Sequence, residues 1–199
     1  MLFATVAIAG AGGLLIYNNI EENRVKVQNT SIVTEFETKM EKYAELDEEG
    51  QINKDLSWLD YEKSIGTEYS TTIDGITYIG ILYFPSISNL SVPIIDDCTD
   101  SLLKVSACRY FGSINEGNMI IAGHSYKSIF GKLASNMSIN DVIYFKDLAG
   151  NVYKYKLTNI EYLLPSDVKK MQEGNWDLSI FTCSYDNQKR ITYRFELVN

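Results

Sequence analysis

The chain has 199 residues, of which 45% are hydrophobic, and a formal net charge of −8 at pH 7. Nucleic-acid binding calls for clustered lysine and arginine side chains, so this charge excludes nucleic acid as an expected partner. The length suits one folded domain with a single core. The 14 tyrosines and 8 phenylalanines favour β-strands, because aromatic side chains fit the half-buried surface of a sheet.

Residues 1–20 carry no charged side chain and are predicted to form a signal anchor, a helix that crosses a membrane. About 20 apolar residues in a helix span the ~30 Å hydrocarbon core of a bilayer. The alternative is a cleaved signal peptide, because small residues at positions 9–13 would suit a signal peptidase. With the anchor in place, the folded domain would lie outside the cytoplasm, tethered to the cell membrane.

Residues 21–72 are predicted to form a helix and a connector outside the membrane. From residue 30 to residue 47 apolar side chains recur at spacings of three and four, which predicts an amphipathic helix capped at Thr30 or Ser31. We expect this helix to be a stalk or to pack against the folded domain, and not to be a regulatory partner site. Residues 47–72 are polar, with many Ser and Thr, which indicates a connector.

The folded domain, residues 73–199, contains short runs typical of strands, separated by turns. Pro93 predicts a free edge or a strand start at its position, and residues 147–151 predict a hairpin turn. Short helices are expected at residues 99–105, capped at Thr99 or Asp100, and at residues 126–133. This pattern favours a closed or nearly closed β-barrel. The eight predicted strands are residues 79–84, 92–95, 107–111, 119–122, 142–146, 153–164, 178–182 and 191–198.

Any cysteine–histidine chemistry in this chain must use His124, because the sequence contains one histidine. Carboxylates around Cys98 would disfavour a thiolate there, and Cys108 lies in a short apolar run typical of a half-buried strand. Cys183 ends a predicted strand, and Arg190 follows at the start of the next. A thiol at a strand end with a cation nearby has the exposure and positive field that a nucleophile needs.

The three cysteines leave at least one thiol unpaired within the chain. The sequence does not decide whether Cys98 and Cys108 form a disulfide, because it does not give the separation of their Cα atoms. No metal or other cofactor is expected. A single histidine excludes zinc sites built from several histidines, and neither a CxxC pair nor an EF-hand loop occurs.

Two segments resemble the signature of the sortase family, whose members are cysteine transpeptidases. Thr182-Cys183 after an apolar strand, followed by Arg190, resembles the sortase TLxTC…R segment. The run GNMIIAGH, residues 117–124, resembles the strand that delivers the sortase histidine. The similarity covers roughly residues 76–198 and keeps the order His, Cys, Arg. Phe181 departs from the smaller residues usual at its position.

The resemblance implies a mainly β fold, the eight-stranded sortase barrel with short helices. Cys183 would attack a peptide carbonyl, and His124 would protonate the departing amine and deprotonate the incoming one. Arg190 stays protonated and would stabilise the oxyanion. Thr182 would contact the substrate or the oxyanion, and the backbone N–H of Ser184 is a candidate second donor.

The implied function is a membrane-anchored enzyme that cleaves an LPxTG-like sorting signal through a cysteine thioester and transfers the acyl group to an amine. Its partners would be surface proteins of a Gram-positive cell that carry this signal, with a peptidoglycan precursor or a pilin as acceptor. Two alternatives stay open: a non-catalytic surface binding module, and a sortase-like enzyme acting mainly as a peptidase or pilin polymerase. Papain-like and NlpC-like hydrolases place the cysteine before the histidine. Since His124 precedes Cys183 here, the order of the two residues argues against these two hydrolase families.

Two features bear on the subclass. Class B sortases carry a long helix where residues 165–175 of this chain allow only a short one. Class C enzymes usually carry an aromatic lid motif with Asp-Pro, which Trp58-Leu59-Asp60 does not supply. We therefore expect the chain to be closest to class A or D sortases, or to an outlying clostridial-type group.

Overall fold

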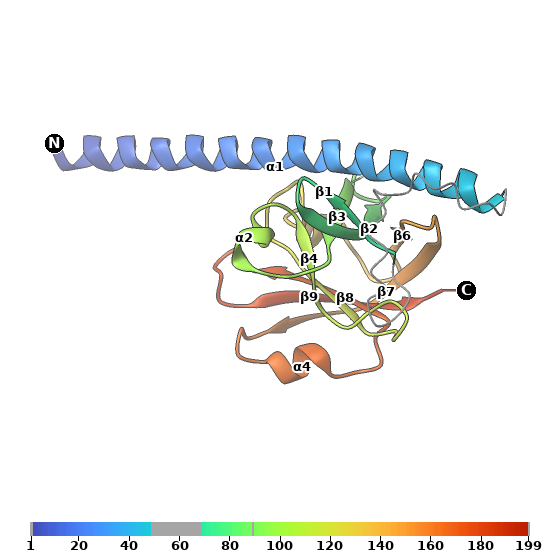
Figure 1. Cartoon of the computed structure of the whole chain (residues 1–199). Coiled ribbons are helices and arrows are strands. Elements are labelled where there is room, and N and C mark those ends of the chain that lie inside the picture. The colour runs from blue at the N-terminus through green and yellow to red at the C-terminus, as the bar shows by residue number, and fades with distance from the viewer. Residues whose placement is uncertain (1, 49–68, 89, 199) are drawn as a thin grey trace.

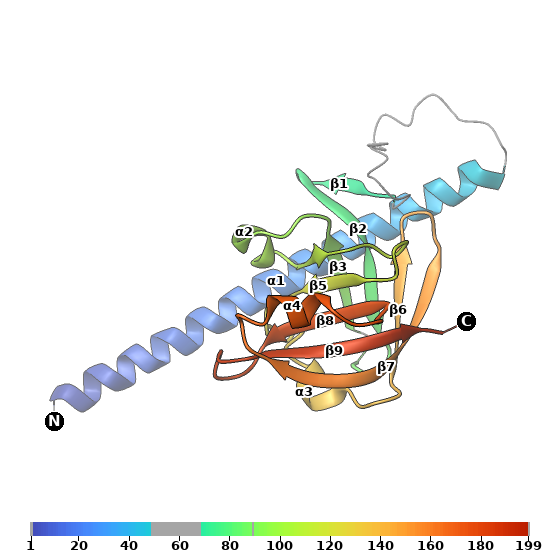
Figure 2. The same cartoon turned by 90° about the horizontal axis from the view of Figure 1, so that it is seen from below.

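The computed structural model describes residues 2–48, 69–88 and 90–198, and in the first range it describes side chains for residues 16–41. Figure 1 shows a long helix lying across one side of a β-barrel, and Figure 2 shows the same arrangement from below. The predicted mainly β fold with short helices is confirmed. Residues 49–68, most of the predicted connector and the whole Trp58-Leu59-Asp60 segment, lie outside the described residues.

The barrel is closed by pairing of its first strand, β2, with β6. Around the barrel the order is β2-β3-β4-β5-β8-β9-β7-β6, and β1 extends the sheet beside β2. Two neighbouring pairs, β3 with β4 and β5 with β8, are parallel. The strands are β1 (Thr71–Ile73), β2 (Ile76–Phe84), β3 (Leu90–Ile95), β4 (Ala107–Phe111), β5 (Met119–Ala122), β6 (Val142–Asp147), β7 (Val152–Leu163), β8 (Leu178–Cys183) and β9 (Arg190–Leu197).

All eight predicted strands are present, and they are the strands that close the barrel. The sequence analysis does not predict β1, a strand of 3 residues that joins β2 through Asp74 and Gly75. Both turn residues have positive φ, 51° and 76°, as a two-residue type I′ hairpin requires. The Asp-Gly pair was therefore the available signal for this hairpin.

The short helices agree with the predictions in part. Thr99 caps α2 (Asp100–Leu103) as predicted, because its Oγ1 accepts a hydrogen bond from the Leu102 N–H at 3.3 Å. The short helix allowed within residues 165–175 is α4 (Val168–Gln172). The helix predicted for residues 126–133 is wrong. That segment folds into turns, in which the Gly131 N–H donates to the Tyr126 carbonyl at 2.8 Å, and α3 (Leu133–Asn136) begins where the predicted helix would end.

Two local predictions within the sheet are confirmed. Residues 147–151 form a turn in which the Gly150 N–H donates to the Asp147 carbonyl at 3.1 Å. The Asp147 carboxylate also accepts from the Asn151 N–H at 2.8 Å. Parallel pairing of β3 with β4 begins at Ile94, so at Pro93 the strand is paired with β2 alone. A missing N–H is tolerated at such an edge position.

One continuous helix, α1 (Leu2–Glu48), replaces the two helices predicted for residues 1–20 and 30–47. Thr30 and Ser31 lie inside α1, so the predicted cap is wrong. The Thr30 hydroxyl donates a hydrogen bond at 2.9 Å to the Lys26 carbonyl, which lies one helical turn earlier. Within the part of the chain that the structure describes, no helix has both the length and the apolarity needed to cross a bilayer.

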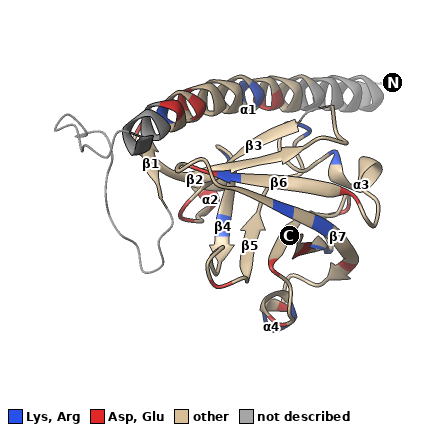
Figure 3. Cartoon of the chain, turned by 90° about the vertical axis from the view of Figure 1, so that its right-hand side faces the viewer, with Lys and Arg blue, Asp and Glu red and all other residues tan. Residues whose placement is uncertain are grey.

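The second half of α1 packs against the barrel, as predicted for the amphipathic helix. Polar side chains contribute as well: the Lys39 ammonium donates to the Thr72 carbonyl at 3.0 Å, and the Tyr83 hydroxyl donates to Glu37 at 2.8 Å. Figure 3 shows acidic and basic residues interspersed along the helix. Among residues 16–41, whose side chains are described, the buried residues of α1 are Val25, Asn29, Ile32, Phe36 and Met40.

We expect Phe36→Ala to lower the free energy of unfolding by about 3 kcal/mol, because it leaves a cavity between α1 and the barrel. Phe36 is 0% exposed, whereas Val27 on the same helix is 71% exposed. Val27→Ala is the matched control and should change stability by less than about 0.5 kcal/mol. Urea denaturation of both variants measures the difference, and equal losses would show that α1 does not dock on the barrel.

Candidate active site

The parallel pairing of β5 with β8 places His124 and Cys183 at the same end of two neighbouring strands. Ala122 of β5 pairs with Phe181 of β8, and His124 and Cys183 each stand two residues further along their strand direction. The Gly123 N–H donates to the Phe181 carbonyl at 3.1 Å, which extends the ladder beyond the end of β5. Because neighbouring strands lie about 4.8 Å apart, the imidazole and the thiol leave the same edge of the barrel.

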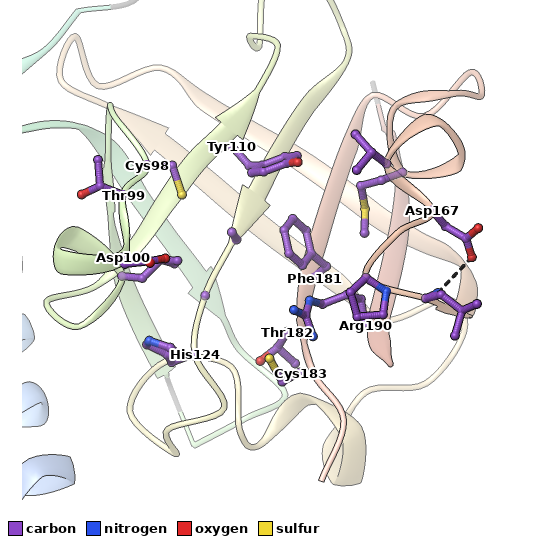
Figure 4. Close-up of a pocket in the computed structure, with 17 residues that line it drawn as sticks. Cys98, Thr99, Asp100, Tyr110, His124, Asp167, Phe181, Thr182, Cys183 and Arg190 are labelled. Atoms are coloured by element: carbon purple, nitrogen blue, oxygen red, sulfur yellow. Dashed lines mark hydrogen bonds between the residues drawn. The ribbon is translucent and has the colours of Figure 1, made fainter. Parts of the chain in front are cut away.

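The antiparallel pairing of β8 with β9 places Arg190 beside Cys183. The two residues are direct partners in the register of these strands. Side chains directly opposite each other in an antiparallel pair share one face, with Cβ atoms about 5 Å apart. Figure 4 shows Arg190 and Cys183 close together, with His124 on the opposite side of the same pocket.

The pocket that contains these three side chains has a volume of about 370 Å³. Tyr110 and Phe181 form part of its wall through an edge-to-face ring contact with centroids 5.3 Å apart. Phe181, the departure from the family pattern, therefore shapes this wall. An apolar pocket with a few convergent polar groups suits a ligand that has an apolar part. The apolar lining residues are Leu103, Tyr110, Ala122, Leu164, Pro165, Val168, Met171 and Phe181.

Thr182 lines the pocket and Ser184 does not. The Thr182 side chain is 3% exposed, and its Oγ1 atom is buried without a hydrogen-bond partner among the described residues. The hydroxyl is therefore shielded from the open space of the pocket in this structure. The Ser184 N–H donates to the Lys189 carbonyl at 2.9 Å inside the β8–β9 turn. Since this donor is already used, Ser184 does not fit the oxyanion role considered for it.

Burial lowers the pKa of His124 from its ordinary value, and the positive charge of Lys104 lowers it further. Asp100 acts in the opposite direction with a smaller effect. The half-buried imidazole is therefore mainly neutral at pH 7. Across the described residues, no group of three or more His, Cys, Asp and Glu side chains is arranged to hold a metal ion.

Two other cations near Arg190 in sequence have different environments. Arg194 is 1% exposed, and its guanidinium donates to Glu161 at 2.7 Å and to Ser179 at 2.8 Å. Lys189 lies over the ring of Tyr162 at 6.0 Å. In the described part of the chain, Arg190 is the one Lys or Arg that lines the pocket.

Part of the pocket wall comes from α2 and from residues 164–171, which the sequence does not predict to lie at the site. These segments lack any motif, and the closure of the barrel brings them to the site. Cys98 is a further lining residue that the sequence does not place there. Cys98 belongs to the segment that leads into α2, far in sequence from His124 and Cys183.

A family model described as the sortase domain matches residues 82–198, which is more than half of the chain. The chain belongs to the sortase family. A comparison with curated protein sequences found no match.

Solved sortase structures share the fold. Sortase C-3 from Streptococcus pneumoniae has a TM-score of 0.56 and 19% identity, over 89% of this chain and 90% of that chain. Sortase A from Listeria monocytogenes has a TM-score of 0.55 and 22% identity, over 61% and 88%. Sortase C-1 from Actinomyces oris has a TM-score of 0.53 and 22% identity, over 61% and 74%. Class A and class C structures match about equally well, so these matches do not assign the subclass.

The single histidine makes the pKa of His124 directly measurable, because one imidazole signal titrates in the proton NMR spectrum. In Cys183→Ala, which removes the neighbouring thiol, we expect a midpoint below the ordinary value of about 6.5. Lys104→Gln in this background should raise the midpoint, and Asp100→Asn should lower it. A midpoint above about 6.5 would contradict the dominance of burial.

Proposed function

We propose that this sortase-family protein is a cysteine transpeptidase, and that Cys183, His124 and Arg190 carry its chemistry. The observation behind the proposal is that three side chains of the required chemical types line one pocket. Transfer of the Cys183 proton to His124 yields a thiolate and an imidazolium, and the first half-reaction uses both. The titration of this pair belongs to the two groups together.

In the first half-reaction the Cys183 thiolate attacks the carbonyl carbon of a peptide bond and forms a tetrahedral intermediate. The Arg190 guanidinium, which is always protonated, stabilises the oxyanion. The carbon–nitrogen bond then breaks, and the His124 imidazolium gives its proton to the departing amine. The acyl group remains on Cys183 as a thioester.

In the second half-reaction an acceptor amine attacks the thioester, and His124 removes a proton from it. The new amide bond forms as the carbon–sulfur bond breaks, which returns Cys183 to the thiolate. This step needs a neutral imidazole, which remains after His124 has given its proton to the departing amine, and the lowered pKa of His124 favours that form. Water in place of the amine would give hydrolysis, which is the peptidase alternative.

The proposed donor is an LPxTG-like sorting signal on a surface protein. The apolar walls of the pocket suit leucine and proline side chains. The proposed acceptor is an amine of a peptidoglycan precursor or of a pilin. The uncharged residues 1–20 support attachment to a membrane with the barrel outside the cytoplasm, and the short α4 supports a class A or D type over class B.

A panel of LPxTG-like peptides, each offered with glycine-type and lysine-type amines, tests this proposal. Mass spectrometry should find the acyl fragment joined to one class of amine. Hydrolysis alone at saturating amine would assign the chain as a peptidase. Binding without cleavage of any peptide would favour the non-catalytic module.

We expect Cys183→Ala to abolish the acyl-enzyme while leaving the thermal midpoint Tm within about 2 °C of the parent protein. Cys183 is half-buried at the end of β8 and contributes little packing. Cys108→Ala is the control, because it removes a buried thiol of the core and should still form the thioester. Intact-mass spectrometry with a cleavable peptide measures both. A thioester in the Cys183→Ala protein would assign the nucleophile elsewhere.

Arg190→Lys and Arg194→Lys should separate catalysis from stability. Arg190→Lys keeps the charge and loses the planar fork, so kcat/KM should fall by about 10²–10³-fold with Tm unchanged. Arg194→Lys should instead lower the free energy of unfolding by about 3 kcal/mol, because lysine cannot make all of its buried hydrogen bonds. Peptide kinetics and urea denaturation give the two readouts. An Arg190→Lys protein with full activity would remove Arg190 from the mechanism.

A further inference from the structure

Two thiols that the proposed reaction does not use lie in contact at the edge of the pocket. The Sγ atoms of Cys98 and Cys108 are 2.9 Å apart, and both cysteines are free. Cys98 follows β3, and Cys108 lies in β4. A disulfide needs a sulfur–sulfur distance of about 2.05 Å, so a shift of roughly 1 Å would bring the two atoms to bonding distance.

The surrounding structure holds the two cysteines in this arrangement. Parallel pairing of β3 with β4 places Ile95 opposite Cys108, three residues before Cys98. Asp96 follows Ile95, and Arg109 follows Cys108. The Asp96 carboxylate pairs with the Arg109 guanidinium, and the Arg109 Nε–H donates to the Asp96 carbonyl at 3.4 Å. Cys108 is therefore fixed in the sheet, and the Asp96–Arg109 pair holds the segment that leads to Cys98 against β4.

The two thiols differ in access and in acidity. Cys98 is half-buried and lines the pocket, whereas Cys108 is 0% exposed. The contact with Cys108 lowers the pKa of Cys98, because a Cys108 S–H can donate to a Cys98 thiolate; burial, Asp97 and Asp100 oppose this effect. The same contact and burial raise the pKa of Cys108. Cys98 is thus the thiol that a dissolved oxidant reaches and the one that ionises first.

We propose that Cys98 and Cys108 are a redox modification site that closes to an intrachain disulfide when the protein meets a small-molecule disulfide. The Cys98 thiolate attacks one sulfur of that disulfide, forms a mixed disulfide and expels one small thiolate. Cys108 then loses its proton and attacks the Cys98 sulfur, which expels the second small thiolate. Two protein thiols are oxidised, and one small disulfide is reduced to two thiols.

The bond would fix one wall of the catalytic pocket. Thr99, Asp100 and Leu103 directly follow Cys98 and line the pocket. On the other side of the bond, Cys108 pairs with Ala122, two residues before His124. The disulfide would therefore join the start of α2 to the strand beside the one that delivers the histidine.

The test compares Cys183→Ser with the Cys183→Ser/Cys108→Ser double variant, so that the proposed nucleophile does not react. Each full-length protein is incubated with oxidised glutathione, and the products are mapped by peptide mass spectrometry without reduction. We expect Cys183→Ser to lose two hydrogen atoms, to carry no glutathione and to yield a Cys98–Cys108 cross-linked peptide. The double variant should retain one glutathione on Cys98.

Oxidised Cys183→Ser should also have a Tm about 5 °C higher than its reduced form, because the bond lowers the conformational entropy of the unfolded chain, and the short loop limits the gain. Amide hydrogens of residues 99–105 should exchange more slowly in the oxidised form, and the double variant should show neither change. A Cys183→Ser protein that keeps glutathione on Cys98, or in which both thiols stay free to alkylate, overturns the proposal. If the disulfide forms but neither Tm nor the amide exchange of residues 99–105 changes, the proposed effect of the bond on the pocket wall is overturned. None of these readouts depends on transpeptidase activity.

Discussion

The buried guanidinium of Arg194 joins β7, β8 and α4 beside the candidate pocket. It pairs with Glu161 of β7, donates to Ser179 of β8 and donates to the Met171 and Lys170 carbonyls of α4. A buried charge is tolerated only when it is paired and its donors are satisfied, and this side chain meets both conditions. Because an unpaired guanidinium would destabilise the fold, the packing of β7, β8 and α4 that pairs Arg194 is favoured.

That arrangement fixes the position of Arg190. Ser179 and Arg194 are direct partners in the β8–β9 register, and Cys183 and Arg190 are partners four residues along each strand. A slip of one residue would break the Arg194–Ser179 hydrogen bond and move the Arg190 side chain to the other face. Arg194 also holds α4, whose Val168 and Met171 line the pocket. A residue outside the pocket thus sets the position of a residue within it.

The strands were predictable because their side chains alternate or form short apolar runs, and these patterns are local. The failures were also local in origin. The sequence predicts a short helix over residues 126–133, but close packing of Gly131 against the Ser125 backbone turns the chain back there. The sequence also predicts separate helices at residues 1–20 and 30–47, whereas α1 is continuous between them and packs Val25 on the barrel.

The candidate site could be predicted to the extent that strand ends mark it. Cys183 ends β8, Arg190 begins β9 and His124 follows the end of β5 by two residues, so reading the strands also located these residues. The walls could not be predicted, because α2 and residues 164–171 approach the site only through the closure of the barrel. Cys98 shows the same limit. Its sequence neighbours are carboxylates, but its nearest decisive contact is Cys108, which parallel pairing brings to it.

The position of α2 links the thiol pair to the acidity of His124. Asp100 is the first residue of α2 and Lys104 is its C-cap, and the two charges shift the pKa of His124 in opposite directions. Coulomb energies vary inversely with distance, so a movement of α2 changes both contributions. The Ser106 N–H donates to the Leu102 carbonyl, and the Ser106 hydroxyl donates to the Pro93 carbonyl at 2.6 Å, which holds the C-terminal end of α2 to the barrel. The N-cap Thr99 follows Cys98 directly, so the contact with Cys108 lies beside the end of α2 that carries Asp100.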